Sequence, residues 1–207
     1  MIVEPDRLRA ELAGTCADAG LDPSAFAVWI VDAARPAGTT PIAYLQPAGV
    51  VRTDTVTVFR VVGAARAARF AHIAHRLALW RDLPGLPDAA LGPVVRHELE
   101  HARRWQKSGT AFYEADERLR ARVGAAAYAG LPTEREANAA AAAYACGALS
   151  AGELAELEAC AELADLFAAE PVDDVVAATL ALLGEDVPFG AERPLDGLAG
   201  GPVIELV

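Results

Sequence analysis

The sequence predicts an α+β domain in which a small N-terminal antiparallel sheet precedes a mostly helical region. Two observations carry this prediction. In the first third, threonines and valines alternate over residues 50–62 with the period of two that is typical of a strand. Further on, apolar residues recur at helical spacing, and alanine, the strongest helix former, is abundant. A chain of 207 residues suits one core, so we expect a single domain over 1–207, sheet-rich in 1–63, helix-rich in 64–183, with a Gly/Pro-rich tail in 184–207.

The N-terminal elements follow from local pattern. A short amphipathic helix is expected over 5–20, because Gly20 can end it. Two apolar runs, 26–31 and 42–46, are expected to be strands, and the alternating segment 50–62 is the third.

The helical region is divided by glycine and proline. The first helix is expected over 64–81, because Phe70, Ile73, Leu77 and Trp80 recur at helical spacing. Pro and Gly residues then separate the segments that follow. We expect further helices at about 93–107 with Gly109 able to end it, 112–129, 133–148 with Thr133 and Glu136 as a capping box, 150–169 and 172–183.

Composition and charge exclude some partners. The formal net charge is −11 and the sequence pI is near 4.8, which argues against nucleic acid and against an anionic membrane surface. There is no signal-peptide pattern and no uncharged apolar stretch of 18 residues, so we expect a cytoplasmic protein. Three cysteines without C-x-x-C spacing, Cys16, Cys146 and Cys160, are expected to be reduced, buried thiols.

Residues 97–101 read His-Glu-Leu-Glu-His, which fits the H-E-x-x-H pattern. Residues at i and i+4 lie on one face of a helix, so the imidazoles of His97 and His101 can reach one metal ion. Glu98, at the flank of that face, can take a proton from a water activated by the metal. The spacing therefore predicts a catalytic zinc site, although other divalent metals could occupy the same ligands.

A catalytic zinc needs a third protein ligand, and downstream acidic residues are the candidates. Glu134 and Glu136 begin a predicted helix two residues apart, about 200° around its axis, so only one of them can face the metal. Three earlier acidic residues are further alternatives: Glu114, Asp116 and Glu117.

The string Glu134-Arg135-Glu136-Ala137-Asn138 follows H-E-x-x-H on a later helix. In this the chain resembles the gluzincin branch of the zincins and is similar to the ImmA/IrrE-type regulatory metallopeptidases; HtpX-type peptidases carry a related Glu-x-x-Ala-Asp. The resemblance covers at most residues 94–148. It implies a zincin-like fold, Glu134 as the third zinc ligand, and Asn138 as a residue that orients a ligand histidine. Metzincins differ, because no third histidine follows His101.

Other polar residues have two interpretations each. His72 and His75 form H-x-x-H on an expected helix and are either a second site or polar-face residues. An electrophile for the substrate oxygen could come from these histidines, from an arginine, or from one of three tyrosines, Tyr113, Tyr128 and Tyr144.

These observations predict a zinc metallopeptidase that hydrolyses peptide or protein substrates, with Glu98 as general base and His97, His101 and Glu134 as metal ligands. By the resemblance to zincins, an edge strand within 50–62 is expected to pair with an extended substrate. One alternative is a zinc-binding regulatory protein with little or latent peptidase activity, latent if the tail covers the cleft. Another is a helical interaction protein without metal. The sequence leaves the substrate and the oligomeric state open.

Overall fold

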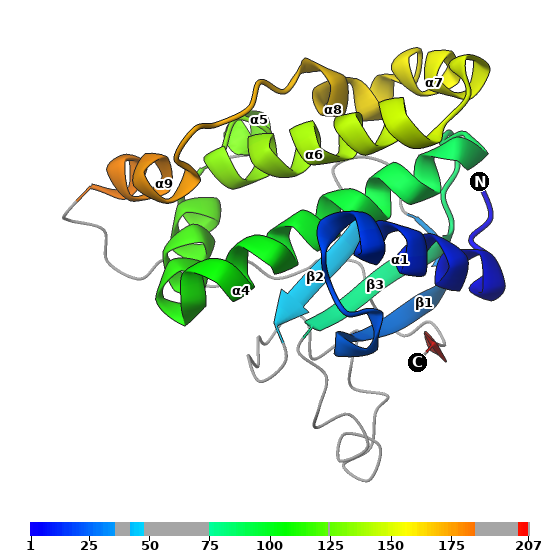
Figure 1. Ribbon diagram of the computed structural model, residues 1–207, viewed down its shortest axis with the longest axis horizontal. Helices are drawn as coiled ribbons and strands as arrows, with labels where there is room; N and C mark the ends of the chain where they lie inside the picture. The colour runs from blue at the N-terminus through cyan, green and yellow to red at the C-terminus, as the bar shows by residue number, and fades with distance from the viewer. Residues whose placement is uncertain (36–41, 48–74, 124, 185–202, 207) are drawn as a thin grey trace, which may run out of the picture.

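The computed structural model describes residues 1–35, 42–47, 75–123, 125–184 and 203–206 (Figure 1). The chain is an α+β protein, as the sequence predicted, and helices dominate it. Its helices are α1 (Pro5–Ala19), α4 (Leu91–Arg122), α5 (Ala125–Tyr128), α6 (Pro132–Ala148), α7 (Ala151–Glu158), α8 (Ala164–Ala168) and α9 (Val175–Leu183). Its strands are β1 (Phe26–Ala34), β2 (Ala43–Pro47), β3 (His75–Asp82) and β4 (Val203–Leu206).

The four strands form one sheet in the order β2-β3-β1-β4. The outer pairs, β2 with β3 and β1 with β4, are antiparallel, but the central pair of β1 and β3 is parallel. The prediction of an antiparallel sheet is therefore wrong for the central pair. Local patterns identify strands but do not choose their partners. Here β3 lies between β1 and β2, which precede it in the chain.

Residues 75–82 correct a second prediction, because they form β3 and not the end of a helix over 64–81. Leu77, Ala78, Leu79 and Trp80 are all buried, at most 3% exposed. A strand buried on both faces reads as a continuous apolar run and lacks the alternation that marks a half-buried strand. The rest of that predicted helix and the predicted strand 50–62 lie outside the described residues.

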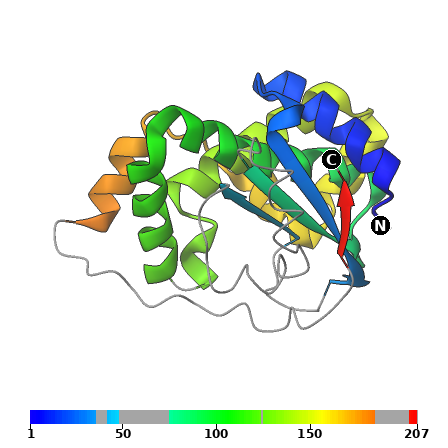
Figure 2. The ribbon, with the colours of Figure 1, turned by 90° about the horizontal axis from the view of Figure 1, so that it is seen from below.

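Three layers position the helices (Figures 1 and 2). Helices α1 and α4 pack together over the sheet, and α6 packs on α4 from the other side. Leu8 of α1 and Leu99 of α4 are fully buried in this core. Fully buried alanines of α6, Ala137, Ala141 and Ala145, face inward. Such small side chains allow close approach of neighbouring helices, so α6 can bring its first turn near α4.

Gly109 interrupts the long helix α4, at the point where the sequence predicted that a helix could end. Its backbone has φ of 80° and ψ of 175° inside an otherwise helical segment, a conformation that residues with a side chain rarely adopt. The helix resumes after this glycine and continues to Arg122. The two halves of α4 therefore point in different directions (Figure 1).

The predicted capping box of Thr133 and Glu136 is wrong for the first turn of α6. Leu131 is the N-cap, and its side chain makes no capping hydrogen bond. Thr133 instead donates to Asp116, and Glu136 pairs with Arg104. Both polar side chains connect α6 to α4.

The C-terminal elements match the predictions in part. The helix expected over 150–169 is divided, because a short 3₁₀ turn at Ala161–Leu163 separates α7 from α8. The last helix, expected over 172–183, is α9. Strand β4 from the tail pairs with β1, at the edge of the sheet opposite β2.

The cysteines are free thiols, as predicted, but only one is buried. Cys16 is buried and its pKa is raised to about 11, chiefly by burial, whereas Cys146 is exposed and Cys160 is partly exposed. Within the described residues, the helices are too short or too polar to cross a membrane.

Candidate metal site

His97 and His101 of α4 meet Glu134 of α6 in one cluster. One ligand atom from each of the three residues lies within 4.8 Å of the others. The Nε2 atoms of His97 and His101 are 3.2 Å apart, and each is 3.3 Å from a different oxygen of Glu134. Two imidazole nitrogens and one carboxylate are the protein ligand set of many catalytic zinc sites.

Helix geometry and one aromatic contact set the orientation of the imidazoles. Spacing of i and i+4 places both rings on one face of α4, where they meet edge to face with centroids 4.9 Å apart. Trp105, one turn further along, stacks on His101 at 5.6 Å with an interplanar angle of 17°. His101 is 4% exposed, so this ring is held between a neighbouring turn and the protein interior.

Glu134 is a buried carboxylate whose charge is stabilised by its neighbours. It is 5% exposed, and its Oε1 forms an ion pair with Arg120. Burial opposes its ionisation, but the charges of Arg120 and His101 outweigh this, and its pKa lies well below the usual value of 4.5. An ionised, buried carboxylate that lies 3.3 Å from both imidazole nitrogens fits a metal cation, so these three residues suit a metal ion.

His97 is the more accessible of the two histidines. Burial lowers its pKa, but the hydrogen bond and charge of Glu134 and the charge of Glu98 outweigh this effect, so the pKa is raised above 6.5. Metal binding requires the neutral imidazole. Binding at this site therefore releases any proton held by His97, and acidic solution opposes it.

Glu98, the predicted general base, lies beside the cluster and outside it. Its side chain is partly exposed, and its charge raises the pKa of both His97 and Tyr128. The carboxylate therefore lies in the electrostatic neighbourhood of the site without contributing a ligand atom to it. Asn138 is buried one turn after Glu134, and its role in orienting a histidine stays a prediction.

The rival third ligands are engaged elsewhere. Glu136 points away from the histidines and pairs with Arg104, at 2.8 Å from its Nε. Asp116 is fully buried and accepts hydrogen bonds from Thr133 Oγ1 at 2.7 Å and from Arg120 Nε at 2.9 Å. Neither carboxylate joins the cluster that contains Glu134.

Arg120 is the residue at this site that sequence reasoning missed. Its guanidinium forms an ion pair with Glu134, donates to Thr133 Oγ1 at 3.1 Å, and lies 3.4 Å from Nδ1 of His101. The i, i+4 pair of Asp116 and Arg120 was the available signal. That signal predicts a surface ion pair, and nothing local indicates that the second half of α4 turns back toward the first.

The structure distinguishes among the candidate electrophiles. Tyr128 is 39% exposed and accepts a hydrogen bond from Arg120 Nη1, so it lies at the cluster. The hydroxyl of Tyr144 lies near Gly14 of α1, away from the cluster. The side chain of Tyr113 and residue His72 lie outside the described part of the structure, and His75 is in β3 and not on the predicted helix.

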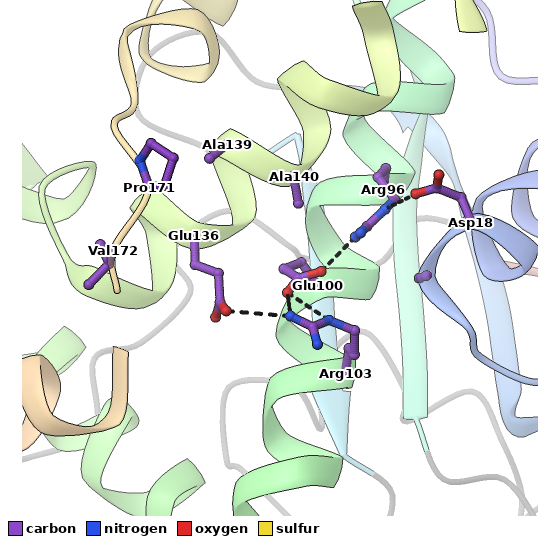
Figure 3. Close-up of a pocket in the computed structure, with 10 residues that line it drawn as sticks. Asp18, Arg96, Glu100, Arg103, Glu136, Ala139, Ala140, Pro171 and Val172 are labelled. Atoms are coloured by element: carbon purple, nitrogen blue, oxygen red, sulfur yellow. Dashed lines mark hydrogen bonds and ion pairs between the residues drawn. The ribbon is translucent and has the colours of Figure 1, made fainter. Parts of the chain in front are cut away.

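A second charged cluster lies on the neighbouring face of α4. Glu100, 2% exposed, accepts from Arg96 Nη1 at 2.8 Å and from Arg103 Nε at 2.8 Å, and Asp18 of α1 pairs with Arg96 (Figure 3). A cavity of about 460 Å³ adjoins these side chains and reaches Pro171. The ion pairs connect α4 to α1 and so stabilise the helix that carries both histidines.

We expect Glu100→Gln to destabilise the fold by about 2 kcal/mol at neutral pH, because Arg96 and Arg103 lose their buried partner and keep only Asp18 and Glu136. Burial raises the pKa of Glu100, but the hydrogen bonds from Arg103 and Arg96 outweigh this effect, so the pKa lies below its usual value of 4.5. Its contribution is therefore present above pH 4.5 and is lost as the pH falls through the lowered pKa. Urea unfolding across this range should show the variant converging on wild type in acid, whereas a constant difference would contradict the assignment. Asp6→Asn, at an exposed ion pair, is the control and should change little.

Comparison of this chain with models of protein families, with curated proteins and with solved structures found no match.

Proposed function

We propose that this protein is a metal-dependent peptidase, with zinc as the expected ion. One observation carries the proposal: His97, His101 and Glu134 form a three-ligand cluster, and Glu98 lies beside it. A purely structural zinc site is closed by four protein ligands, whereas a catalytic site has three and leaves a position for water or substrate. The cluster therefore favours catalysis over a structural role.

Each residue has a role in hydrolysis. A bound zinc ion would supply a Lewis acid that polarises the scissile carbonyl and acidifies a water molecule. Glu98 accepts a proton from the attacking water and passes it to the leaving amine. The stacked Trp105 holds the ring of His101 in place, and the ionised Glu134 supplies negative charge in a site shielded from solvent.

Strand β2 offers a surface for the substrate. It pairs with β3, has no second partner among the described strands, and packs against α4. An extended peptide can add to such an edge through main-chain hydrogen bonds. The substrate class we infer is therefore an extended segment of a peptide or an unfolded protein. The edge expected within 50–62 lies outside the described residues and stays a prediction.

Tyr128 is our candidate for the group that donates to the substrate carbonyl. Arg120 can only donate hydrogen bonds, so the Tyr128 oxygen accepts from it and the phenolic proton is free to donate elsewhere. Partial burial raises the pKa of Tyr128, against the opposing charge of Arg120. The hydroxyl therefore stays protonated at neutral pH and can stabilise a developing oxyanion.

Tyr128→Phe should reduce kcat roughly 10²-fold, as loss of one oxyanion donor does, and leave KM and zinc content nearly unchanged. Steady-state kinetics on a fluorogenic peptide would measure this split. Tyr144→Phe, remote from the site, is the matched control. Equal kcat in both variants would remove Tyr128 from the mechanism.

The proposal itself is tested with the purified wild-type chain. We expect it to hydrolyse an unfolded protein or a peptide from a mixed library, to lose this activity to a chelator, and to regain it with one equivalent of zinc. Mass spectrometry of the products identifies the bonds cleaved. Tight zinc binding without any hydrolysis would contradict the proposal and favour a zinc-binding regulatory protein, and failure to bind any metal would favour an interaction protein.

A further inference from the structure

We infer that Arg120 competes with the metal for Glu134 and so sets the metal affinity of the site; this inference rests on the metal site proposed above. Two independent contacts carry it. The guanidinium forms an ion pair with Oε1 of Glu134, and it also lies behind the ring of His101.

The first contact places two cations at one carboxylate. Oε1 of Glu134 is 3.3 Å from Nε2 of His101 and is also the atom paired with Arg120 Nη1. An ion held by the two histidines and Glu134 draws on the same negative charge. Arginine stays charged at any pH that a protein tolerates, so it cannot release the carboxylate by losing a proton. Metal and guanidinium therefore repel each other at close range in a buried setting, where charges are weakly screened.

The second contact concerns the proton of His101. Nε2 faces the cluster, so ligation through this atom requires the ring proton to be on Nδ1. Nδ1 lies 3.4 Å from Nη2 of Arg120, and both groups would then be donors. Protein sites usually place an acceptor behind a ligand histidine, which supports binding. Here a cation has that place, and it favours the opposite tautomer.

The rest of the Arg120 environment explains why the arginine is held there. Asp116, fully buried, accepts from its Nε, and Thr133 accepts from its Nη2. Together with Glu134 these groups compensate a charge that is costly to bury. Arg120 consequently stabilises the ionised Glu134 in the absence of a metal, and a bound metal competes with it for this carboxylate.

The sign of one measurement tests the inference. Arg120→Met should bind zinc roughly tenfold or more tightly than wild type, measured by competition with a chelator of known affinity. An ordinary supporting residue would give the opposite result, since losing such partners typically weakens binding 10- to 100-fold. Arg118→Met removes the same charge two residues away, where the arginine donates to its own helix at Glu114, and should match wild type. Unchanged or weaker binding in Arg120→Met would overturn the inference.

A second variant separates competition from net charge and guards against misfolding. Asp116→Asn combined with Arg120→Met keeps the local net charge and leaves neither partner of the pair buried alone. This double variant should still bind zinc more tightly than wild type; affinity equal to wild type would mean that net charge alone acts. In the wild-type chain, the side-chain Nε resonance of Arg120 should shift as zinc is added, and an unshifted resonance would also refute competition.

These results are distinguishable from failure of the proposed function. Tighter zinc binding by the variants of a chain that cleaves no peptide would sustain the inference and defeat the peptidase proposal. Looser binding by the variants of a zinc-dependent peptidase would do the reverse.

Discussion

Glu98→Gln is expected to abolish peptide hydrolysis while one zinc ion per chain remains bound. The amide has nearly the same shape as the carboxylate but cannot accept a proton, so the attacking water and the leaving amine lose their proton carrier. Positioned general bases contribute about 10² to 10⁴ in rate. A loss in kcat of at least this size should therefore appear in steady-state assays, with metal content measured by mass spectrometry on the same sample.

Glu114→Gln is the matched control for this result. Glu114 is an exposed carboxylate of the same helix, α4, beyond the Gly109 break, and its neutralisation should leave turnover unchanged. Full activity in Glu98→Gln would refute the mechanism, even if the metal site is real. Loss of zinc together with activity would instead make Glu98 a ligand, which its place outside the cluster does not predict.

Glu134→Ala is expected to weaken zinc binding by roughly 100-fold or more, beyond what loss of an outer partner costs. It removes one of the three ligands, and no other carboxylate of the described residues belongs to the cluster. His97→Ala and His101→Ala should behave in the same way. Equilibrium competition with a chelator, followed by metal analysis of the protein, measures the effect.

Glu136→Ala is the control, because Glu136 is two residues away on α6 and pairs with Arg104. This variant should retain zinc and activity. Glu134→Ala also leaves Arg120 with one fewer buried counter-charge, so circular dichroism must show that it is folded before its affinity is interpreted. Zinc retained by folded Glu134→Ala and lost by Glu136→Ala would exchange the roles of the two glutamates.

The part of this site that the sequence predicted is the part fixed by helix geometry. The distance from His97 to His101 follows from a single turn, so a local pattern is sufficient. Glu134 could not be predicted from helix geometry, because it lies on another helix. The resemblance of residues 134–138 to the gluzincin Glu-x-x-Ala-Asn string favoured it over Glu136. The structure brings the selected residue to the histidines, which the string alone could not have shown.

The parts that could not be predicted depend on long-range contacts. Nothing in residues 75–82 says that they are covered on both faces, and a fully buried strand shows neither helical nor alternating period. The parallel pairing of β1 with β3 arises because β3 enters the sheet between β1 and β2, and no local pattern shows this position. Arg120 was missed for the same reason, since its partners Thr133 and Glu134 lie on α6 and His101 lies in the other half of α4.

The break at Gly109 also makes the position of Arg120 depend on the number of residues that follow this glycine. His101 and Arg120 are 19 positions apart, and a straight helix would separate their backbones by about 28 Å, too far for their side chains to meet, yet Nη2 of Arg120 lies 3.4 Å from Nδ1 of His101. The second half of α4 thus folds back toward the first, and the direction in which each of its side chains points depends on its distance in sequence from Gly109. One residue inserted or deleted between Gly109 and Asp116 would rotate Arg120 by about 100°, while both histidines kept their spacing. Sequence length along this arm can therefore change the metal affinity without changing any ligand.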